Sequence, residues 1–360
     1  MYYLRKSLLL SSRIRYSKKR NTKRDLMLDR NERTIELNKK IIDKLSKKIS
    51  KVNIGLYPEL DSFYSKLSKW LRVKKENLFI TEGVSGGIKS IIETTCKENY
   101  SNIIFPDPSF ALYKVYANTL GIKYKTIRYN VDFNFDINKI YKIVDNKTAI
   151  IFLPNPNIPL EYNIKKNDII KLLKFCKRKK ILLILDEVYY PFGGSTYLSL
   201  IKDYKELLIM RSFSKAFGLA GIRIGFIIGN KRLINYISKI RTGYETNSLS
   251  IEAASFFLDN YNLVNDYIDE IKLSINQLKL RLKSLGIESI GGKYSNYLFI
   301  NLKKKYLANK ITYKLEKNGI YVRSKWSKPF DKGILVSGSS KKNLSKFFQQ
   351  FKKIYIKINK

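Results

Sequence analysis

Residues that could form an amine-based catalytic site lie between positions 212 and 225. This run places two serines, Lys215 and Arg223 among glycines and small residues, directly after a short apolar segment. Such a composition suits an anion pocket with an amine beside it, and burial would lower the pKa of Lys215 and make it a nucleophile for a carbonyl. The alternative is a surface loop that contains one of the 70 basic residues. A bare Ser-x-x-Lys would favour that alternative, but the complete run favours the pocket.

Two further runs contain groups that could serve the same site. Asp186 follows the apolar segment Ile181–Leu185 directly, and a carboxylate buried at a strand end is costly unless it meets a cation. The run Thr81–Gly87 follows another apolar segment, and small residues that open a helix present N–H groups and a positive dipole end to an anion. The plain alternatives are a helix N-cap for Asp186 and an ordinary strand-to-helix loop for Thr81–Gly87.

The run around Lys215 resembles the Schiff-base signature of class I and II aminotransferases, most of all the histidinol-phosphate aminotransferase branch. The resemblance extends over residues 25–350 and implies an enzyme that depends on pyridoxal-5′-phosphate (PLP). It implies that Lys215 binds the cofactor as a Schiff base and then moves the proton between the substrate α-carbon and the cofactor. Asp186 would face the protonated ring nitrogen, which keeps the ring an electron sink, and Tyr189 would hydrogen-bond the phenolic oxygen.

The same resemblance implies a full set of cofactor contacts. Ring stacking would fall to Phe110, for which core packing is the alternative. Tyr57 would reach across a subunit interface to the neighbouring cofactor phosphate, which implies a homodimer; a simple turn residue is its alternative. The implied cofactor-binding residues are Tyr57, Gly83, Val84, Ser85, Phe110, Asn157, Asp186, Tyr189, Ser212, Ser214, Lys215 and Arg223.

Two positions depart from the family's pattern. The family's loop Asn-Pro-x-Asn-Pro-Thr-Gly appears here as Asn155–Glu161, and the asparagine that contacts the ring oxygen falls on Ile158, so Asn157 is the candidate substitute. The arginine that clamps the substrate α-carboxylate falls on Ile334, which offers nothing comparable to a bidentate arginine–carboxylate pair. Arg323 stands at the position where, in the branch of the family that acts on phosphorylated substrates, an arginine contacts the substrate phosphate.

These positions indicate a transaminase that acts on a small phosphorylated or phosphonate amine or carbonyl substrate, together with an amino-acid donor. A solvated loop acid is an equal alternative for Glu245. Two other functions stay open: a PLP-dependent decarboxylase or lyase of a phospho-amino acid, and a basic nucleic-acid-binding or catalytically inactive relative. The substrate-binding candidates are Asn31, Glu245, Asn247 and Arg323.

Short apolar runs alternate with helical patterns in the middle of the chain. Such runs suit strands that are buried on both faces of a parallel sheet. The sequence therefore predicts an α/β protein, which by resemblance is a fold type I PLP-dependent transferase with a large domain and a smaller α+β domain. The expected strands are 102–105, 149–153, 181–185, 207–210, 224–228, 297–302, 320–322 and 334–336, with helices over 86–95, 165–178, 264–285 and 308–318. The expected domains are an N-terminal arm and part of the small domain (1–50), the large domain (51–255) and the small domain (256–360).

Composition excludes several classes of function. The chain has no histidine, so the commonest metal ligand and neutral-pH general base is missing, and we expect no metal. The formal net charge is +40, but the lysines are spread along the chain without a nucleic-acid motif, so we expect no nucleic-acid partner.

The cysteines and the apolar runs bear on the compartment. Cys96 and Cys176 form no disulfide framework and are expected in the core. No apolar run is long enough to span a bilayer, and residues 1–24 lack a signal-peptide pattern. We expect a cytoplasmic biosynthetic enzyme without a membrane partner.

Overall fold

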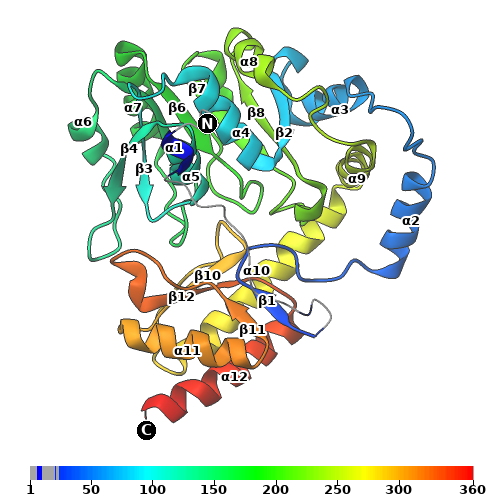
Figure 1. Ribbon diagram of the computed structural model, residues 1–360. Coiled ribbons are helices and arrows are strands. Elements are labelled where there is room, and N and C mark those ends of the chain that lie inside the picture. The colour runs from blue at the N-terminus through cyan, green and yellow to red at the C-terminus, as the bar shows by residue number, and fades with distance from the viewer. Residues whose placement is uncertain (1–5, 10–20, 22–23, 360) are drawn as a thin grey trace.

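The computed structural model describes residues 6–9, 21 and 24–359. Figure 1 shows a large unit built around one sheet with helices on both faces, and a second unit that ends in the C-terminal helix. Most of the expected N-terminal arm lies outside the described residues. Its described part, α1 (Lys6–Leu9), lies near α5 (Leu112–Thr119), where the Ser7 hydroxyl donates a hydrogen bond of 3.2 Å to the Thr119 carbonyl.

The large unit is built on a seven-stranded sheet. Its strands are β2 (Leu78–Glu82), β3 (Asn102–Asp107), β4 (Lys123–Arg128), β5 (Thr148–Pro154), β6 (Leu182–Asp186), β7 (Leu207–Ser212) and β8 (Ile224–Gly229). Their order across the sheet is β2-β8-β7-β6-β5-β3-β4. All neighbours from β4 to β7 pair in parallel, whereas β8 runs antiparallel to β7 and β2. The predicted α/β fold with a mostly parallel sheet is confirmed.

The central strands are buried on both faces, which explains their continuous apolar sequences. One face enters the hydrophobic cluster that contains Ile103, Ile150, Ile184 and Leu208, and the other face enters the cluster that contains Ile104, Ile151, Leu185 and Ile209. The five strands predicted in this region are confirmed, with ends that differ by two residues at most. Strand β4 was not predicted because it lies at the sheet edge, where only Ile127 is buried.

Helices cover the two faces of the sheet (Figure 1). Helix α4 packs on β2, β7 and β8 and buries its isoleucines in one cluster, whereas α7 buries its apolar side chains in the other. The helices predicted over 86–95 and 165–178 are confirmed as α4 and α7. The helices of this unit are α2 (Lys39–Ile49), α3 (Asp61–Leu71), α4 (Gly83–Thr95), α5, α6 (Lys139–Ile143), α7 (Lys166–Lys179), α8 (Lys231–Ile237) and α9 (Ser248–Asp259).

The second unit combines two small sheets with three helices. Strands β9 (Ser289–Gly291), β10 (Tyr297–Asn301) and β12 (Gly333–Ser337) form an antiparallel sheet with β10 in the centre. The helices are α10 (Asn262–Lys283), α11 (Lys305–Lys317) and α12 (Lys341–Asn359). Strand β1 (Leu26–Leu28) pairs in parallel with β11 (Ile320–Val322), so the N-terminal segment joins this unit. The predicted strands and helices of this region are confirmed, whereas the exact domain boundaries stay predictions.

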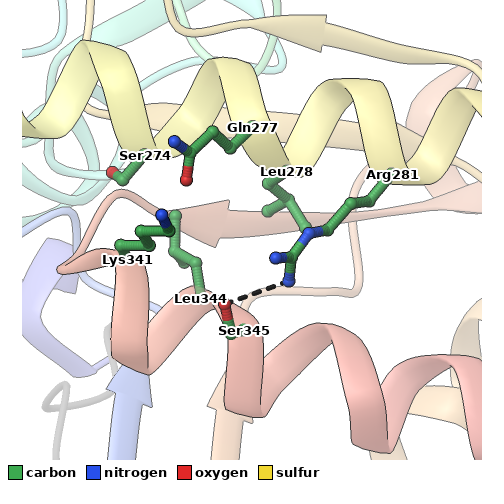
Figure 2. A pocket seen from close by; sticks show the side chains of 7 residues that line it. All are labelled: Ser274, Gln277, Leu278, Arg281, Lys341, Leu344 and Ser345. Carbon is green, nitrogen blue, oxygen red and sulfur yellow. Dashed lines mark hydrogen bonds between the residues drawn. The ribbon is translucent and has the colours of Figure 1, made fainter.

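A small hollow lies between α10 and α12 (Figure 2). Its volume is about 10 Å³, and Arg281 of α10 donates a hydrogen bond of 3.0 Å across it to the Ser345 hydroxyl of α12. A hollow of this size holds about one water molecule, so it belongs to the helix packing and cannot take a substrate. Among residues 6–9, 21 and 24–359, no helix is both long and apolar enough to cross a membrane.

Candidate active site

The carboxyl ends of two neighbouring strands bring the principal predicted residues together. Strand β6 ends at Asp186 and β7 ends at Ser212, three residues before Lys215. The strands pair in parallel with Asp186 opposite Met210. Asp186 at the end of β6 and Lys215 just after β7 therefore lie at the same edge of the sheet. Ligands of open α/β sheets bind beyond this edge.

Lys215 is held by backbone carbonyls of the N-terminal segment. Its Nζ donates hydrogen bonds of 2.9 Å each to the carbonyls of Arg30 and Asn31. Burial, the largest cause, lowers the pKa of Lys215 to about 8, and the charge of Arg323 adds to this effect while that of Asp186 opposes it. A lysine with such a pKa is partly neutral near neutral pH, which a nucleophile for carbonyls requires.

Asp186 is a buried carboxylate whose phenolic partner the sequence analysis missed. Its side chain is 2% exposed, and burial raises its pKa to about 6. The Tyr113 hydroxyl donates to Oδ2 at 2.5 Å, and the Val188 N–H donates to Oδ1 at 3.1 Å. Tyr113 lies at the start of α5, three residues after Phe110. That spacing places both rings on one side of a helical turn, which was the signal available in the sequence.

Phe110 and Tyr113 form one aromatic group beside Asp186. Their ring centroids lie 6.0 Å apart in an edge-to-face arrangement. Tyr113 in turn stacks on Phe152 of β5 with centroids 4.8 Å apart. Phe110 is half-buried. The two rings therefore offer an aromatic surface next to the Asp186 carboxylate, which the Tyr113 hydroxyl holds by a hydrogen bond.

Tyr189 and Asn31 connect the sheet edge to the C-terminal unit. The Asn31 side-chain amide donates to the Tyr189 hydroxyl at 2.8 Å. The Asn31 N–H donates to the Ser337 hydroxyl at 2.8 Å, and that hydroxyl donates back to Asn31 Oδ1 at 3.0 Å. Burial raises the pKa of Tyr189 above its usual range, so this hydroxyl stays protonated at neutral pH.

The structure also gathers the residues predicted to hold a phosphate. Arg223 donates to the Ser85 hydroxyl at 3.3 Å, and Ser212 donates to the Ser214 hydroxyl at 2.9 Å. Gly83, at the start of α4, has a φ of +64°, and a Cβ there would lie 2.7 Å from the Arg223 guanidinium. Only a glycine leaves this approach open, and the helix start adds N–H donors. The cradle therefore fits the phosphate group of PLP.

The ring contacts and hydrogen bonds described for three other candidates do not involve Lys215. Tyr57 is 75% exposed and stacks on Tyr244, with centroids 4.4 Å apart. Glu245 is buried; its Oε1 accepts from Tyr64 and Arg241, while its Oε2 has no partner among the described residues. Asn247 caps α9 by accepting the Ser250 N–H at 2.9 Å, so a structural role accounts for its side chain.

The structure does not support Asn157 as a donor to the cofactor ring. Its amide already donates to the Pro108 carbonyl at 3.0 Å and to the Tyr129 hydroxyl at 2.6 Å, and its oxygen accepts from Ser109 at 2.8 Å. An amide has two N–H donors, so none is left over. The neighbouring Ile158 is buried among apolar side chains.

Both cysteines were predicted to lie in the core. Cys176 is fully buried, but Cys96 is only partly buried.

Arg323 and Ile334 both belong to the second unit, Arg323 directly after β11 and Ile334 within β12. The backbone of Arg323 bridges to Leu335 of β12, and its guanidinium lies 4.4 Å from the centre of the Trp326 ring. Burial is the largest influence on both neighbouring groups and lowers the pKa of Lys215 but raises that of Tyr189, whereas the charge of Arg323 acts to lower both pKa values. Ile334 is completely buried. The charges of Arg323 and Arg223 both act to lower the pKa of Lys215, and a substrate-binding role for Arg323 stays a prediction.

A family model for aminotransferases of class I and II matches residues 25–330. The chain is a class I and II aminotransferase. The histidinol-phosphate aminotransferase of Buchnera aphidicola subsp. Melaphis rhois is 32% identical over 291 residues, which cover 78% of this chain and 79% of that protein. The corresponding enzyme of Pyrococcus furiosus is 30% identical over 312 residues, which cover 84% of this chain and 88% of that protein.

A solved structure supports the fold of this aminotransferase. The histidinol-phosphate aminotransferase of Sinorhizobium meliloti, in complex with pyridoxal-5′-phosphate, superposes with a TM-score of 0.84 at 18% identity, covering 92% of this chain and 91% of that one. The fold type I architecture, PLP dependence and transaminase class are thus confirmed. The aminotransferase is similar to the histidinol-phosphate branch, and the roles of its individual residues stay predictions. Within the described residues, no group of three potential metal ligands occurs.

Proposed function

We propose that this aminotransferase moves an amino group between an amino-acid donor and a small carbonyl compound that bears a phosphate or phosphonate. The observation that supports this proposal is the position of Arg323. Its charge acts on both Lys215 and Tyr189, whereas the family's carboxylate-binding position holds the buried Ile334. A dianionic phosphate suits an arginine fork. Histidinol phosphate, the substrate in the names of the relatives, is the amine partner of such a phosphorylated carbonyl compound.

Each residue of the proposed site has a defined task. Lys215 holds the cofactor and, once released, moves a proton at the substrate α-carbon; its pKa of about 8 suits both the donation and the acceptance of a proton. When bound, PLP supplies an electron sink for a carbanion at that carbon. Asp186 pairs with the ring nitrogen, and Tyr113 keeps the Asp186 carboxylate in place. Ser85, Ser212, Ser214 and Arg223 bind the cofactor phosphate.

The assembly proposed here is a homodimer in the cytoplasm with a biosynthetic role. Apolar side chains at Ile54, Leu56 and Tyr57 are at least 67% exposed. A run of this kind on a surface otherwise rich in charge suits an interface between two copies. Tyr57 would then reach the phosphate cradle of the partner subunit. Two free cysteines without a disulfide suit a reducing compartment.

The test compares three purified proteins: wild type, Lys215→Ala and Arg323→Ala. Each is screened with amino-acid donors against phosphorylated and unphosphorylated carbonyl substrates. We expect wild type to show a bound-cofactor absorbance band and amino transfer, and Lys215→Ala to lose both. Arg323→Ala should keep the band but raise KM for the phosphorylated substrate by about tenfold to a hundredfold, because a charge-assisted bidentate contact contributes about 1.5–3 kcal/mol.

Arg323→Lys is the matched control because it keeps the charge but loses the planar fork. An unchanged KM in Arg323→Ala would remove the phosphate assignment while leaving the transaminase intact. Carbon dioxide release from a phospho-amino acid, without amino transfer, would instead establish the lyase alternative. Salt-dependent DNA binding by a protein without any cofactor band would favour the binding-protein alternative.

A further inference from the structure

Glu161 occupies a position where the family's loop has glycine. It follows β5 at the end of the segment Asn155–Glu161, and its φ is +28°. Residues with a side chain rarely adopt positive φ, and such strain persists only where the surrounding structure imposes it. The side chain must therefore make interactions that offset the unfavourable backbone.

The Glu161 carboxylate accepts hydrogen bonds from the turn that joins β9 to β10. Oε1 accepts the Gly292 N–H at 2.8 Å and also the Ser295 hydroxyl, and Oε2 accepts the Lys293 N–H at 3.0 Å. Burial raises the pKa of Glu161, while these hydrogen bonds oppose the rise. All three partners donate, so they select an acceptor-only group, which an ionised carboxylate is and an amide is not.

The next residue of that turn, Asn296, shares a hydrogen-bond acceptor with Lys215. Asn296 is completely buried, and its side-chain amide donates to the Asn31 carbonyl at 3.0 Å. The same carbonyl accepts the Lys215 Nζ at 2.9 Å. Hydrogen bonds thus connect Glu161 to the turn, the backbone leads from Ser295 to Asn296, and hydrogen bonds connect Asn296 and Lys215 to the same Asn31 carbonyl.

We propose that Glu161 is a positioning residue that holds this turn so that Asn296 fixes the Asn31 carbonyl against the Lys215 amine. The large unit contributes Glu161 and Lys215, and the second unit contributes the turn between them. Glu161 therefore sets the register of the two units at the catalytic amine. This inference rests on the proposed role of Lys215.

The experiment uses Glu161→Gln and Glu161→Gly, with Glu76→Gln as the control, because Glu76 is exposed in the short turn Lys75–Asn77 before β2 and its replacement removes the same charge. Amide hydrogen exchange is followed in the cofactor-free proteins at Gly292, Lys293 and Asn31. Steady-state kcat and KM are measured in the cofactor-loaded proteins. Ser295→Ala, which removes one of three donors, is included in case the Glu161 variants fold poorly.

We expect faster exchange at all three amides in both Glu161 variants, including Asn31, which Glu161 does not touch. The kcat should fall about tenfold or more, since small displacements of a catalytic group are costly, while KM for the phosphorylated substrate stays within about twofold of the control. Ser295→Ala should shift both readouts in the same direction by less. Gln should not rescue, because its amide nitrogen would face the Lys293 N–H.

Unchanged exchange at Asn31, or a kcat within about twofold of Glu76→Gln despite faster exchange at the turn, would reduce Glu161 to a local clamp and overturn the proposal. The exchange measurements need no turnover. If wild type itself transfers no amino group, the proposed function fails, whereas the hydrogen-bonded connection is still judged by exchange at Asn31.

Discussion

Burial moves the pKa values of the two principal groups toward each other. That of Asp186 rises to about 6 and that of Lys215 falls to about 8. Each shift shows that the cofactor-free protein disfavours the charged form of the group, because the site removes water without supplying a full counter-charge. If PLP binds as proposed, its ring and its covalent link to Lys215 would relieve both costs.

Replacement of Asp186 by Asn should stabilise the cofactor-free protein at pH 8. The folded-state pKa of about 6 lies above the ordinary aspartate value of 3.8, so the folded protein binds this proton more tightly than the unfolded chain. Stability is then lost as pH rises between these values, by about 3 kcal/mol in total. Asp186→Asn should avoid that loss, and its advantage in urea unfolding should shrink to about half at pH 5.

Asp203→Asn is the control for this experiment because Asp203 is exposed, and its urea midpoint should stay near that of wild type at both pH values. A variant at 186 that is no more stable than wild type at pH 8 would contradict the shifted pKa. With PLP bound, the order should reverse, because the asparagine cannot pair with a protonated ring nitrogen.

The residue types at the site were largely predictable, but their contacts were not. The motifs around Lys215 and Asp186 identified the amine and the acid, because each follows a strand in an unusual context. Tyr113 was missed because a tyrosine in a helix usually packs in the core, and nothing local marks its hydroxyl as a partner of Asp186. The contacts of Asn157 were not predictable for the complementary reason: its partners Tyr129 and Pro108 come from other loops.

At the scale of elements, the phosphate cradle depends on the close approach of β8 to the start of α4. Gly225 makes this approach possible, because a Cβ there would lie 2.5 Å from the Gly83 carbonyl carbon and 2.7 Å from the Val84 nitrogen. Both contacts are to backbone, which cannot swing aside as a side chain can. The helix start and the strand therefore form one rigid element.

Gly225→Ala should push β8 away from α4 and disturb the cradle. We expect a loss of about 1–3 kcal/mol or more of unfolding free energy, measured by urea unfolding, and weaker PLP binding. Gly221→Ala is the matched control, since its Cβ would meet nothing within 4 Å; it should change the unfolding free energy by about 0.5 kcal/mol or less. Equal behaviour of the two variants would refute the packing argument.

Buried strands were predicted from the sequence more accurately than exposed or short ones. Strands with both faces covered gave continuous apolar runs and were located to within two residues. Strand β4 at the edge and β1, which has only three residues, gave no such run. The pairing of β1 with β11 was beyond the sequence, because nothing in either short segment specifies a partner some 300 positions away.

At the scale of the whole molecule, one exposed apolar region indicates where two copies would meet. Leu56 is 67% exposed next to Tyr57, and Tyr57 stacks on Tyr244. The formal net charge of +40 disfavours association elsewhere on the surface through like-charge repulsion. The proposed homodimer would therefore form at this apolar region, where burial would outweigh repulsion.

Sedimentation of the purified protein should give twice the chain mass of 42.2 kDa. Leu56→Asp should shift it to the monomer and weaken PLP binding, because Tyr57 of the partner would no longer reach the cradle. Leu273→Asp is the control: this leucine is 62% exposed on α10, and its replacement should leave the dimer intact. A wild type that sediments as a monomer while retaining full activity would rule out the shared site.

The pairing of β1 with β11 affects how the protein is made. Asn31 lies just after β1 and is held by Ser337, near the other end of the chain. A ribosome that has finished the entire seven-stranded sheet has still not produced the residues that orient Asn31 toward Lys215. The nascent chain therefore acquires the environment of its proposed cofactor-binding lysine only after Ser337 has been made, so a polypeptide that terminates before that residue is left without it.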